Sequence, residues 1–376
     1  MVNSTVTKLH YDIVGSFLRP DELKKAREDF HNKKITAEEL QKVENDLISK
    51  LVEKEKESGL KIVTDGEFRR SYWHLDTFWG FEGIEHVKPS HGYLFHDEET
   101  RADSARVVGK IKFKEDHPDL LAYKFLAKLV ENDSEITARQ SIPAPAQFYS
   151  ELVRDEANTE ALRKVYQDDD ELIADIGKAY HELILALYEA GCRDIKLDDC
   201  TWGMVVDNNY WATRASEGLD RQEIQKVYLA ANNAALADLP DDLRISTHVC
   251  RGNYHSTWAA SGGYAPVADY LFAKENVSAF YLEFDDNRSG DFAPLAKVPE
   301  GKDVVLGLVT SKHPELESPE SLIVRVNEAT QYVPLEHLQL STQCGFASTE
   351  EGNKLSPDQQ WAKIKLVIDT AKQIWK

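Results

Sequence analysis

The 376-residue sequence has no apolar run that approaches the ~18 residues of a membrane span. Its first nine residues are polar and lack the apolar core of a signal sequence. It also has no excess of positive charge, because 45 Lys and Arg stand against 65 Asp and Glu, for a formal net charge of −20. Such a chain repels nucleic acid and anionic lipid. These absences predict a cytoplasmic protein with no nucleic-acid or membrane partner.

Cysteine is scarce, with four residues at Cys192, Cys200, Cys250 and Cys344. So few thiols in so long a chain do not make a disulfide framework. In a reducing compartment they are free thiols, metal ligands or nucleophiles. Low-complexity stretches are also missing, and 42% hydrophobic residues suffice for a large core. Disorder is therefore excluded as the main interpretation.

Short β-rich runs alternate with helical segments along the whole chain. Eight runs are predicted as strands: 11–16, 60–65, 136–142, 194–198, 243–248, 279–283, 303–308 and 338–342. Helix signals lie between them, such as a capping box at Thr36 and Glu39, a periodic apolar face over 171–190, and Ser-Pro starts at 318–319 and 356–357. Alternating β and α elements predict a parallel sheet.

Eight such units favour a closed (β/α)₈ TIM barrel over an open, doubly wound sheet. No Gly-x-Gly-x-x-Gly follows the first strand, which weakens a dinucleotide-binding interpretation. The polar stretch of about 85–135 is predicted to be an insertion after the second strand. The expected organisation is one catalytic domain over 1–376.

Metal-binding residue types gather where the predicted strands end, which is where a barrel carries its chemistry. His248 and Cys250 are two apart on one strand and so face the same way. Glu283 ends the next strand and Cys344 follows the last, which completes a plausible N/S/O/S set for zinc. The alternative is that the two cysteines are small buried hydrophobes. Cys200 is either a rival ligand or a neighbour of the site, and Cys192 is expected in the core.

Carboxylates follow two of the strands as well. Adjacent strand residues face opposite ways, so only one of Asp198 and Asp199 points into a barrel. Together with Glu67, that carboxylate would hold a substrate ammonium at the barrel mouth. The alternatives are a salt bridge, a helix cap or a solvent-facing loop position.

These strand-end residues, taken in order, resemble the catalytic barrel of cobalamin-independent methionine synthase in its short, single-barrel form. The resemblance covers about residues 10–350. It rests on Gly-Ser-Phe at 15–17, Asp-Gly-Glu at 65–67, Ile-Lys-Leu-Asp-Asp at 195–199, Thr-His-Val-Cys at 247–250, Glu283, and Cys-Gly at 344–345. The ordered combination is specific, although no single element is.

The resemblance implies a methyltransferase of methionine biosynthesis. Zinc would be held by His248, Cys250, Glu283 and Cys344, with one weak protein ligand or a water at an exchangeable position. Glu67 and Asp198 would bind the amino group of homocysteine, and Ser16 its carboxylate. The donor would be a methylated folate, 5-methyltetrahydropteroyl-glutamate. Lys312 or His313 stands where the family has a histidine that serves as the acid, and Tyr149 where it has a tryptophan near the folate.

Other functions stay open on the sequence. The full-length family has an N-terminal barrel that helps to hold folate, and this chain has no room for it. The same barrel would therefore also suit a different methyl donor or thiol. A metal-free barrel of the uroporphyrinogen-decarboxylase type and a non-catalytic zinc- or amino-acid-binding protein are further candidates. The sequence does not predict an oligomeric state.

Overall fold

A computed structural model describes residues 9–216 and 218–376. Its centre is a parallel sheet of six strands, in the order β10-β9-β8-β7-β6-β5. The strands are β5 (Gln140–Pro143), β6 (Asp194–Asp199), β7 (Arg244–Val249), β8 (Ala279–Glu283), β9 (Asp303–Val309) and β10 (Leu338–Thr342). Spatial neighbours are therefore also neighbours in sequence, as in a barrel.

The ring continues beyond β5 through shorter elements. β4 (Thr137–Ala138) precedes β5 with only Arg139 between them, and it pairs in parallel with β1 (Ile62–Val63). The predicted first strand is reduced to one parallel bridge between Tyr11 and Leu340. On the opposite side of this segment, the Ile13 amide donates to the side chain of Asp12, at 2.7 Å.

Side-chain and loop hydrogen bonds join the first segment to β1. The Thr64 hydroxyl donates to the Gly15 carbonyl at 2.6 Å, and the Phe17 amide donates to the Gly66 carbonyl at 3.2 Å. All eight predicted strand regions thus lie in sequence order around one ring. Within 9–216 and 218–376, no continuous backbone ladder spans this last junction.

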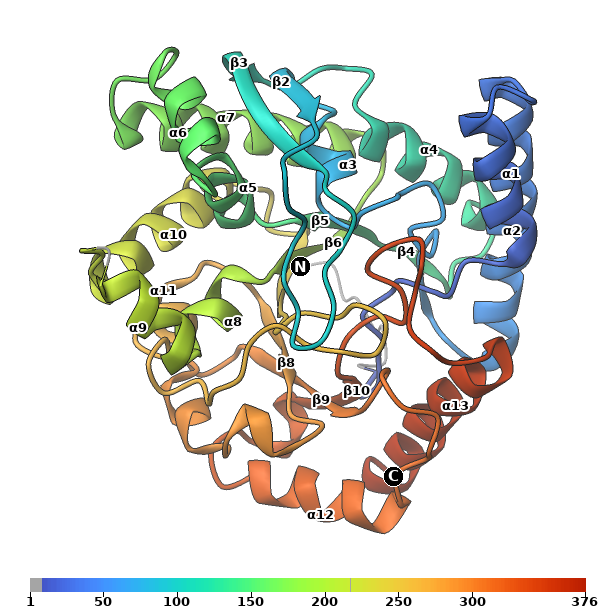
Figure 1. Ribbon diagram of the computed structural model, residues 1–376. Coiled ribbons are helices and arrows are strands. Elements are labelled where there is room, and N and C mark those ends of the chain that lie inside the picture. The colour runs from blue at the N-terminus through green and yellow to red at the C-terminus, as the bar shows by residue number, and fades with distance from the viewer. Residues whose placement is uncertain (1–8, 217) are drawn as a thin grey trace.

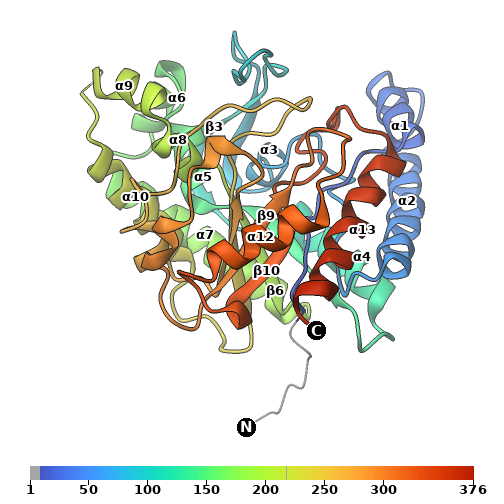
Figure 2. The same cartoon turned by 90° about the horizontal axis from the view of Figure 1, so that it is seen from below.

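Helices surround the strands on the outside of the ring (Figure 1). Figure 2 shows α12 and α13 lying along the outer side of the sheet near β9 and β10, with α2 beyond α13. The helices are α1 (Asp21–His31), α2 (Ala37–Ser58), α3 (Leu75–Phe78), α4 (Pro118–Val130), α5 (Pro145–Leu152), α6 (Glu156–Arg163), α7 (Asp169–Glu189), α8 (Thr201–Val206), α9 (Asn208–Ser216), α10 (Arg221–Ala235), α11 (Leu271–Lys274), α12 (Pro319–Ala329) and α13 (Pro357–Ile374). Three 3₁₀ turns are η1 (Asn287–Ser289), η2 (Ala293–Lys297) and η3 (Leu335–His337).

Local sequence signals set several of these helix ends as predicted. The capping box of Thr36 and Glu39 begins α2, and Gly59, in a left-handed conformation with φ of +99°, ends it. Pro319 and Pro357 occupy the first turns of α12 and α13, each after a capping serine. In the described part of the chain, no helix is both long and apolar enough to cross a membrane.

An antiparallel hairpin interrupts the alternation between β1 and β4. Its strands are β2 (Glu82–Val87) and β3 (Ser104–Lys112), and the loop that joins them crosses the open end of the ring in Figure 1. The His96 ring stacks on Trp258 at 4.5 Å between centroids, and its amide donates to the Trp258 carbonyl. The loop therefore forms a roof over the barrel mouth. The limits of the insertion, about 85–135, stay a prediction, and that stretch also contains α4.

A buried ion network fills the barrel interior at the end away from this roof. Arg139, 1% exposed, donates to Asp194 at 2.8 Å and to Asp12 at 2.8 Å. The Tyr281 hydroxyl donates to Asp12 at 2.6 Å. One guanidinium thus compensates two buried carboxylates from different strands.

Replacing Arg139 should strongly destabilise the fold. In Arg139→Met, Asp12 is left buried without its counter-ion and Asp194 keeps only Arg244, at 3.3 Å, and breaking such a buried pair costs about 3–5 kcal/mol. Urea unfolding at neutral pH measures the loss. Lys297→Met is the control, because its ion pair with Asp269 is exposed and such pairs contribute at most about 1 kcal/mol. Equal losses in the two variants would contradict the prediction.

Candidate metal centre and substrate cavity

Four side chains with metal-ligating atoms converge at the roofed end of the barrel. Alternation along β7 turns His248 toward the interior, and Cys250 follows it on the same side. Glu283 ends β8 and Cys344 follows β10. All four are buried, and one ligand atom from each lies within 4.8 Å of the others. The two sulfur atoms, Sγ of Cys250 and Sγ of Cys344, are 3.7 Å apart.

The hydrogen bonding of this cluster is incomplete. Both ring nitrogens of His248 and Oε2 of Glu283 are buried with no hydrogen-bond partner in the described chain. Buried polar atoms are rarely left unpaired unless an ion or water completes the site. Imidazole, thiolate and carboxylate are the usual zinc ligands. The four residues therefore fit a bound metal ion such as zinc.

Burial and mutual contact favour the neutral form of the two cluster thiols when no cation is considered. The neighbouring Cys200 thiol, together with burial, raises the pKa of Cys250 well above its ordinary value. The neighbouring Cys250 thiol and burial raise the pKa of Cys344 in the same way. A bound cation reverses this preference, because it stabilises thiolates. Metal binding at this cluster is thus expected to release protons.

Glu67 is held at the mouth by a strained backbone. It has a φ of +59°, which is unusual for a residue with a side chain, and it follows Gly66 at +68°. Arg70 donates to its Oε1 at 3.3 Å, while Oε2 is buried and unpaired among the residues described. Burial, aided by the nearby Asp198, raises the pKa of Glu67 to about 7 although Arg70 opposes the shift. Backbone strain and a perturbed acid are typical of functional positions.

The two adjacent aspartates at the end of β6 face opposite ways, as predicted. Asp199 points to the helix layer, where Asn232 of α10 donates to it at 3.0 Å and Thr201 also donates. Asp198 points into the barrel, and its Oδ1 has no partner within the described residues. Burial lowers the pKa of Lys196, which is two residues earlier on the same face, while Asp198 opposes that shift.

A cavity of about 920 Å³ joins these groups. Six of the residues predicted as site residues line it: Ser16, Glu67, Asp198, His248, Cys250 and Cys344. Ser16 lies so close to Gly345 that a Cβ at position 345 would be 1.9 Å from its hydroxyl oxygen, so only glycine fits after Cys344. Glu283 is fully buried and is not among the residues that line the cavity.

Sequence reasoning did not identify the residues of the roof and the outer wall. Tyr93, Phe95 and His96 of the hairpin loop and Tyr210 and Tyr228 beside α9 and α10 line the same cavity. They come from loops and helix faces with no metal-ligand spacing. Cys200, which the sequence analysis had named as a rival ligand or a neighbour of the site, also lines this cavity.

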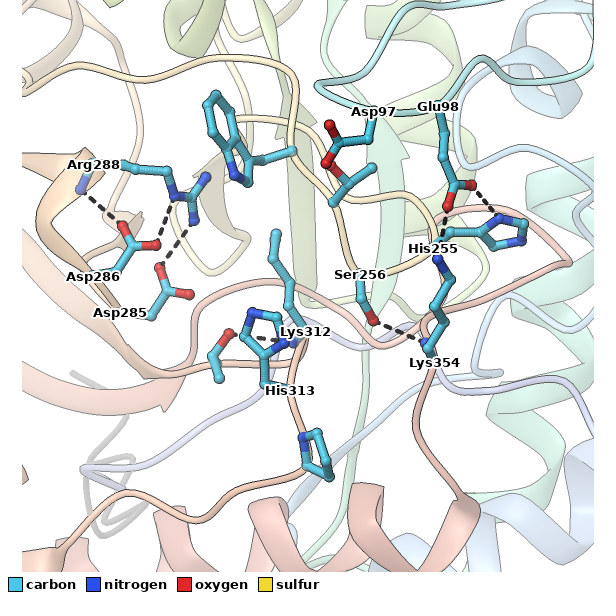
Figure 3. Close-up of a pocket in the computed structure, with 14 residues that line it drawn as sticks. Asp97, Glu98, His255, Ser256, Asp285, Asp286, Arg288, Lys312, His313 and Lys354 are labelled. Carbon is cyan, nitrogen blue, oxygen red and sulfur yellow. Dashed lines mark hydrogen bonds and ion pairs between the residues drawn. The ribbon is translucent and has the colours of Figure 1, made fainter.

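Lys312 and His313 lie in a second cavity of about 540 Å³, on the far side of Trp258, which lines both cavities. Figure 3 shows them between the Arg288 and Asp286 pair on one side and the Glu98, His255 and Lys354 cluster on the other. Lys312 is buried, and its Nζ donates to Asn253 Oδ1 at 3.3 Å. Asn253 lines the larger cavity and donates to the Gly345 carbonyl, whereas His313 is exposed.

Tyr149 does not face the larger cavity. Its hydroxyl donates to Asp169, at the start of α7, at 2.7 Å, and its ring lies against Tyr228. Within the described chain, neither cavity is lined by it, although its α5 neighbours Gln147 and Ser150 line the larger one. The contacts of Tyr149 therefore give no support to a direct role in cofactor binding.

The fold and this site define a (β/α)₈ barrel with a metal-ligating cluster at the carboxyl ends of its strands. The family described as "Cobalamin-independent synthase, Catalytic domain" matches residues 158–372. The Bacillus subtilis protein YxjH, itself uncharacterised, is 45% identical over 368 residues, which are 97% of this chain and 94% of YxjH. The chain belongs to the cobalamin-independent methionine synthase family.

Solved structures agree with this assignment. A Listeria monocytogenes protein assigned as a vitamin-B12-independent methionine synthase is 36% identical, with a TM-score of 0.76 and 98% of each chain covered. A B12-independent methionine synthase from Shewanella sp. W3-18-1, in complex with selenomethionine, is 18% identical, with a TM-score of 0.71 and 97% of each chain covered. The predictions of the TIM-barrel fold and of the family are thereby confirmed.

Removing either cluster thiol should remove the metal. Protein purified without a chelating tag should contain about one zinc per chain, and Cys250→Ser or Cys344→Ser should contain far less, because a lost thiolate weakens a four-ligand site. Elemental analysis by mass spectrometry measures this. Cys192→Ser is the control, since its buried thiol donates to the Asp194 carbonyl, at 3.3 Å, and a hydroxyl preserves that bond. Full zinc content in both site variants would contradict the prediction.

Proposed function

We propose that the protein is a zinc-dependent methyltransferase that moves a methyl group from a methylated folate to the thiolate of homocysteine and forms methionine. The observation that carries this proposal is one cavity that joins unpaired metal-ligating atoms to two inward carboxylates, Glu67 and Asp198. A metal at the cluster suits a thiol, and the carboxylates suit an ammonium. Selenomethionine, bound in the Shewanella enzyme, is the selenium analogue of the proposed product.

Each residue then has one task. His248, Cys250, Glu283 and Cys344 would hold zinc, which lowers the pKa of a bound thiol and so supplies the nucleophile. Glu67 and Asp198 would bind the ammonium, and Ser16 would donate to the carboxylate of the amino acid. These contacts fix the sulfur relative to the incoming methyl group, and positioning of this kind accounts for much of the rate in a transfer reaction.

The leaving amine of the donor must be protonated, and Lys312 is better supported for this task than His313. Its buried ammonium reaches Asn253, which is part of the wall of the larger cavity. The exposed imidazole of His313 faces the smaller cavity only. Of the two side chains, Lys312 is therefore the better placed to act on the donor.

The identity of the methyl donor has less support than the identity of the thiol acceptor. Aromatic side chains of the larger cavity, Tyr93, Phe95, Tyr210 and Tyr228, suit a flat heterocycle such as a pterin. Because Tyr149 turns away from that space, a different methyl donor is the second candidate. A metal-free decarboxylase is less consistent with the unpaired metal-ligating atoms of His248 and Glu283.

The activity test is formation of methionine from homocysteine by the zinc-loaded protein, followed by mass spectrometry. Methyltetrahydrofolate with one and with three glutamates, and other methylated amines and sulfonium compounds, are supplied one at a time. Turnover with the folates supports the proposal. Turnover with another donor alone would replace the folate but keep the thiol acceptor, and no methylation of any thiol would contradict the proposed function.

Glu67→Gln should weaken binding of homocysteine through its amino group. Loss of a hydrogen bond to a charged group costs about 1.5–3 kcal/mol, so KM should rise about ten- to a hundredfold. Because the pKa of Glu67 is about 7, its carboxylate neutralises below that pH. The wild-type KM should therefore rise as pH falls from about 8 to about 6, and this part of the rise should vanish in the variant.

The desamino thiol 4-mercaptobutyrate provides the control for that experiment. It keeps the sulfur and the carboxylate but lacks the ammonium, so its KM should respond little to Glu67→Gln. An equal effect of the substitution on both thiols would mean that Glu67 does not contact the amino group.

Lys312→Met should lower kcat about 10²- to 10⁴-fold with little change in the KM for homocysteine, because a positioned acid acts in the transition state. His313→Ala should have a small effect, since this side chain is exposed. Steady-state kinetics with saturating donor measure both variants. The reverse order of effects would assign the acid to His313.

A further inference from the structure

Arg70 contacts Glu67 but is not among the residues that line the larger cavity. Its Nη1 donates to Glu67 Oε1 at 3.3 Å and to the Trp73 carbonyl at 3.2 Å. Its Nη2 donates to Asp119 Oδ1 at 2.8 Å and to the Ser141 carbonyl at 2.5 Å. Because each terminal nitrogen of a guanidinium carries two hydrogens, these four acceptors occupy them all. Arg70 is therefore fixed in place, and it gives Glu67 a single hydrogen bond.

Asp119 is the second buried carboxylate that Arg70 contacts. It lies in the first turn of α4, and its Oδ2 accepts a hydrogen bond from the Thr77 hydroxyl of α3 at 2.7 Å. The Arg70 and Asp119 side chains are 7% and 5% exposed. Within the described chain, Asp119 lines neither of the two cavities. Its influence on a ligand in the larger cavity must therefore pass through Arg70.

One guanidinium is thus shared between two carboxylates, and it does not compensate them equally. Burial by itself would raise the pKa of Asp119, but the attraction and hydrogen bonding of Arg70 lower that pKa below its ordinary value. For Glu67 the balance is the opposite, because burial outweighs the attraction of Arg70 and raises the pKa to about 7. The shorter of the two hydrogen bonds also goes to Asp119. Glu67 therefore keeps uncompensated negative charge when it is ionised.

We propose that Asp119 is a positioning residue that holds Arg70 in this shared arrangement, so that Arg70 orients Glu67 through one oxygen and leaves the other for the substrate ammonium. This inference rests on the proposed function for the identity of that ammonium. The available oxygen is Glu67 Oε2, which is buried and has no hydrogen-bond partner among the described residues. If Asp119 lost its charge, Arg70 would pair with both oxygens of Glu67, which is the geometry that guanidinium and carboxylate groups prefer.

The physical advantage is orientation without neutralisation. A carboxylate that is paired through both oxygens with an arginine has little negative charge left for a second cation, and a carboxylate without a partner is free to rotate. Glu67 lies between these limits, because Arg70 fixes its Oε1 while Asp119 shares the positive charge of Arg70. The three side chains together keep an excess of negative charge, which a substrate ammonium would balance.

Asp119→Asn tests the proposal in the zinc-loaded full chain. Asparagine keeps the size of the side chain and an oxygen for Arg70 but removes the charge. We expect the KM for homocysteine at about pH 8 to rise about tenfold, the order expected when a charge is removed several ångströms away, with little change in kcat. The KM for 4-mercaptobutyrate should change little, because that thiol has no ammonium. An equal rise for both thiols would overturn the proposal.

The pH dependence of KM distinguishes this role from a purely structural one. In the wild type, the KM for homocysteine relative to 4-mercaptobutyrate should rise from about pH 8 to about pH 6, as Glu67 takes up a proton. In Asp119→Asn the undivided charge of Arg70 should keep Glu67 ionised, so this rise should largely vanish. The substitution leaves in place the other charged groups that interact with Glu67, which are Arg19, Asp65, Lys196 and Asp198.

Thr77→Val is the matched control, because it removes the hydroxyl hydrogen bond to Asp119 but leaves the charge. It should keep the wild-type pH dependence. Asp119→Ser, which also lacks the charge and suits the start of a helix, serves if Asp119→Asn does not fold. A wild-type pH dependence in the uncharged variant, or its loss in Thr77→Val, would overturn the proposal.

Urea unfolding gives a reading without substrate. A free Glu side chain titrates near about 4.3, whereas burial raises the pKa of Glu67 to about 7 in the folded protein. The folded wild type therefore binds this proton more strongly, and relative to Glu67→Gln it should lose stability between about pH 5 and about pH 7. In the Asp119→Asn background this relative loss should shrink, because Arg70 then lowers the pKa of Glu67 further.

A relative loss of the same size in both backgrounds would overturn the proposal. If the wild type methylates no homocysteine, the proposed function fails, while the unfolding data still decide whether Asp119 controls Glu67.

Discussion

The parallel register between β6 and β7 is the constraint on which the site depends. It pairs Asp198 with His248 and Asp199 with Val249. Because partners in a parallel ladder face the same side, one register puts the Asp198 carboxylate beside His248, one of the four candidate metal ligands. A slip by one residue would turn both toward the helix layer. In the proposed function, this register sets the spacing between the groups that would bind the amino group and the sulfur of homocysteine.

Polar groups in the barrel interior are compensated in two different ways. At the end of the barrel away from the roof, Arg139 donates direct hydrogen bonds to Asp12 and Asp194. At the roofed end, the polar atoms of His248, Glu283 and Asp198 are left unpaired within the described chain. Burial of unpaired polar groups costs free energy. The first network stabilises the fold, and the second leaves the unpaired groups on which the proposed function rests.

Loop residues form the parts of the two cavities that the strands do not. The hairpin loop covers the mouth through the stack of His96 on Trp258, and Trp258 separates the two cavities. Asn253 connects them, since it contacts both Lys312 and the Gly345 carbonyl. Lys312 is thereby linked to the wall of the larger cavity by one hydrogen bond.

The sequence by itself determined the local structure and the types of ligand. Alternation of strands and helices, the cap at Thr36 and the spacing of His248 and Cys250 depend on near neighbours, and periodicity reports near neighbours. Tertiary structure alone decided the contacts between distant segments: the roof over the mouth, the separation of Lys312 from His313, the inward turn of Asp198 and the place of Cys200. Tyr149 shows the limit of prediction from sequence, because a matched position in the sequence does not determine where its side chain points. The Tyr149 hydroxyl donates to Asp169 and not toward the larger cavity.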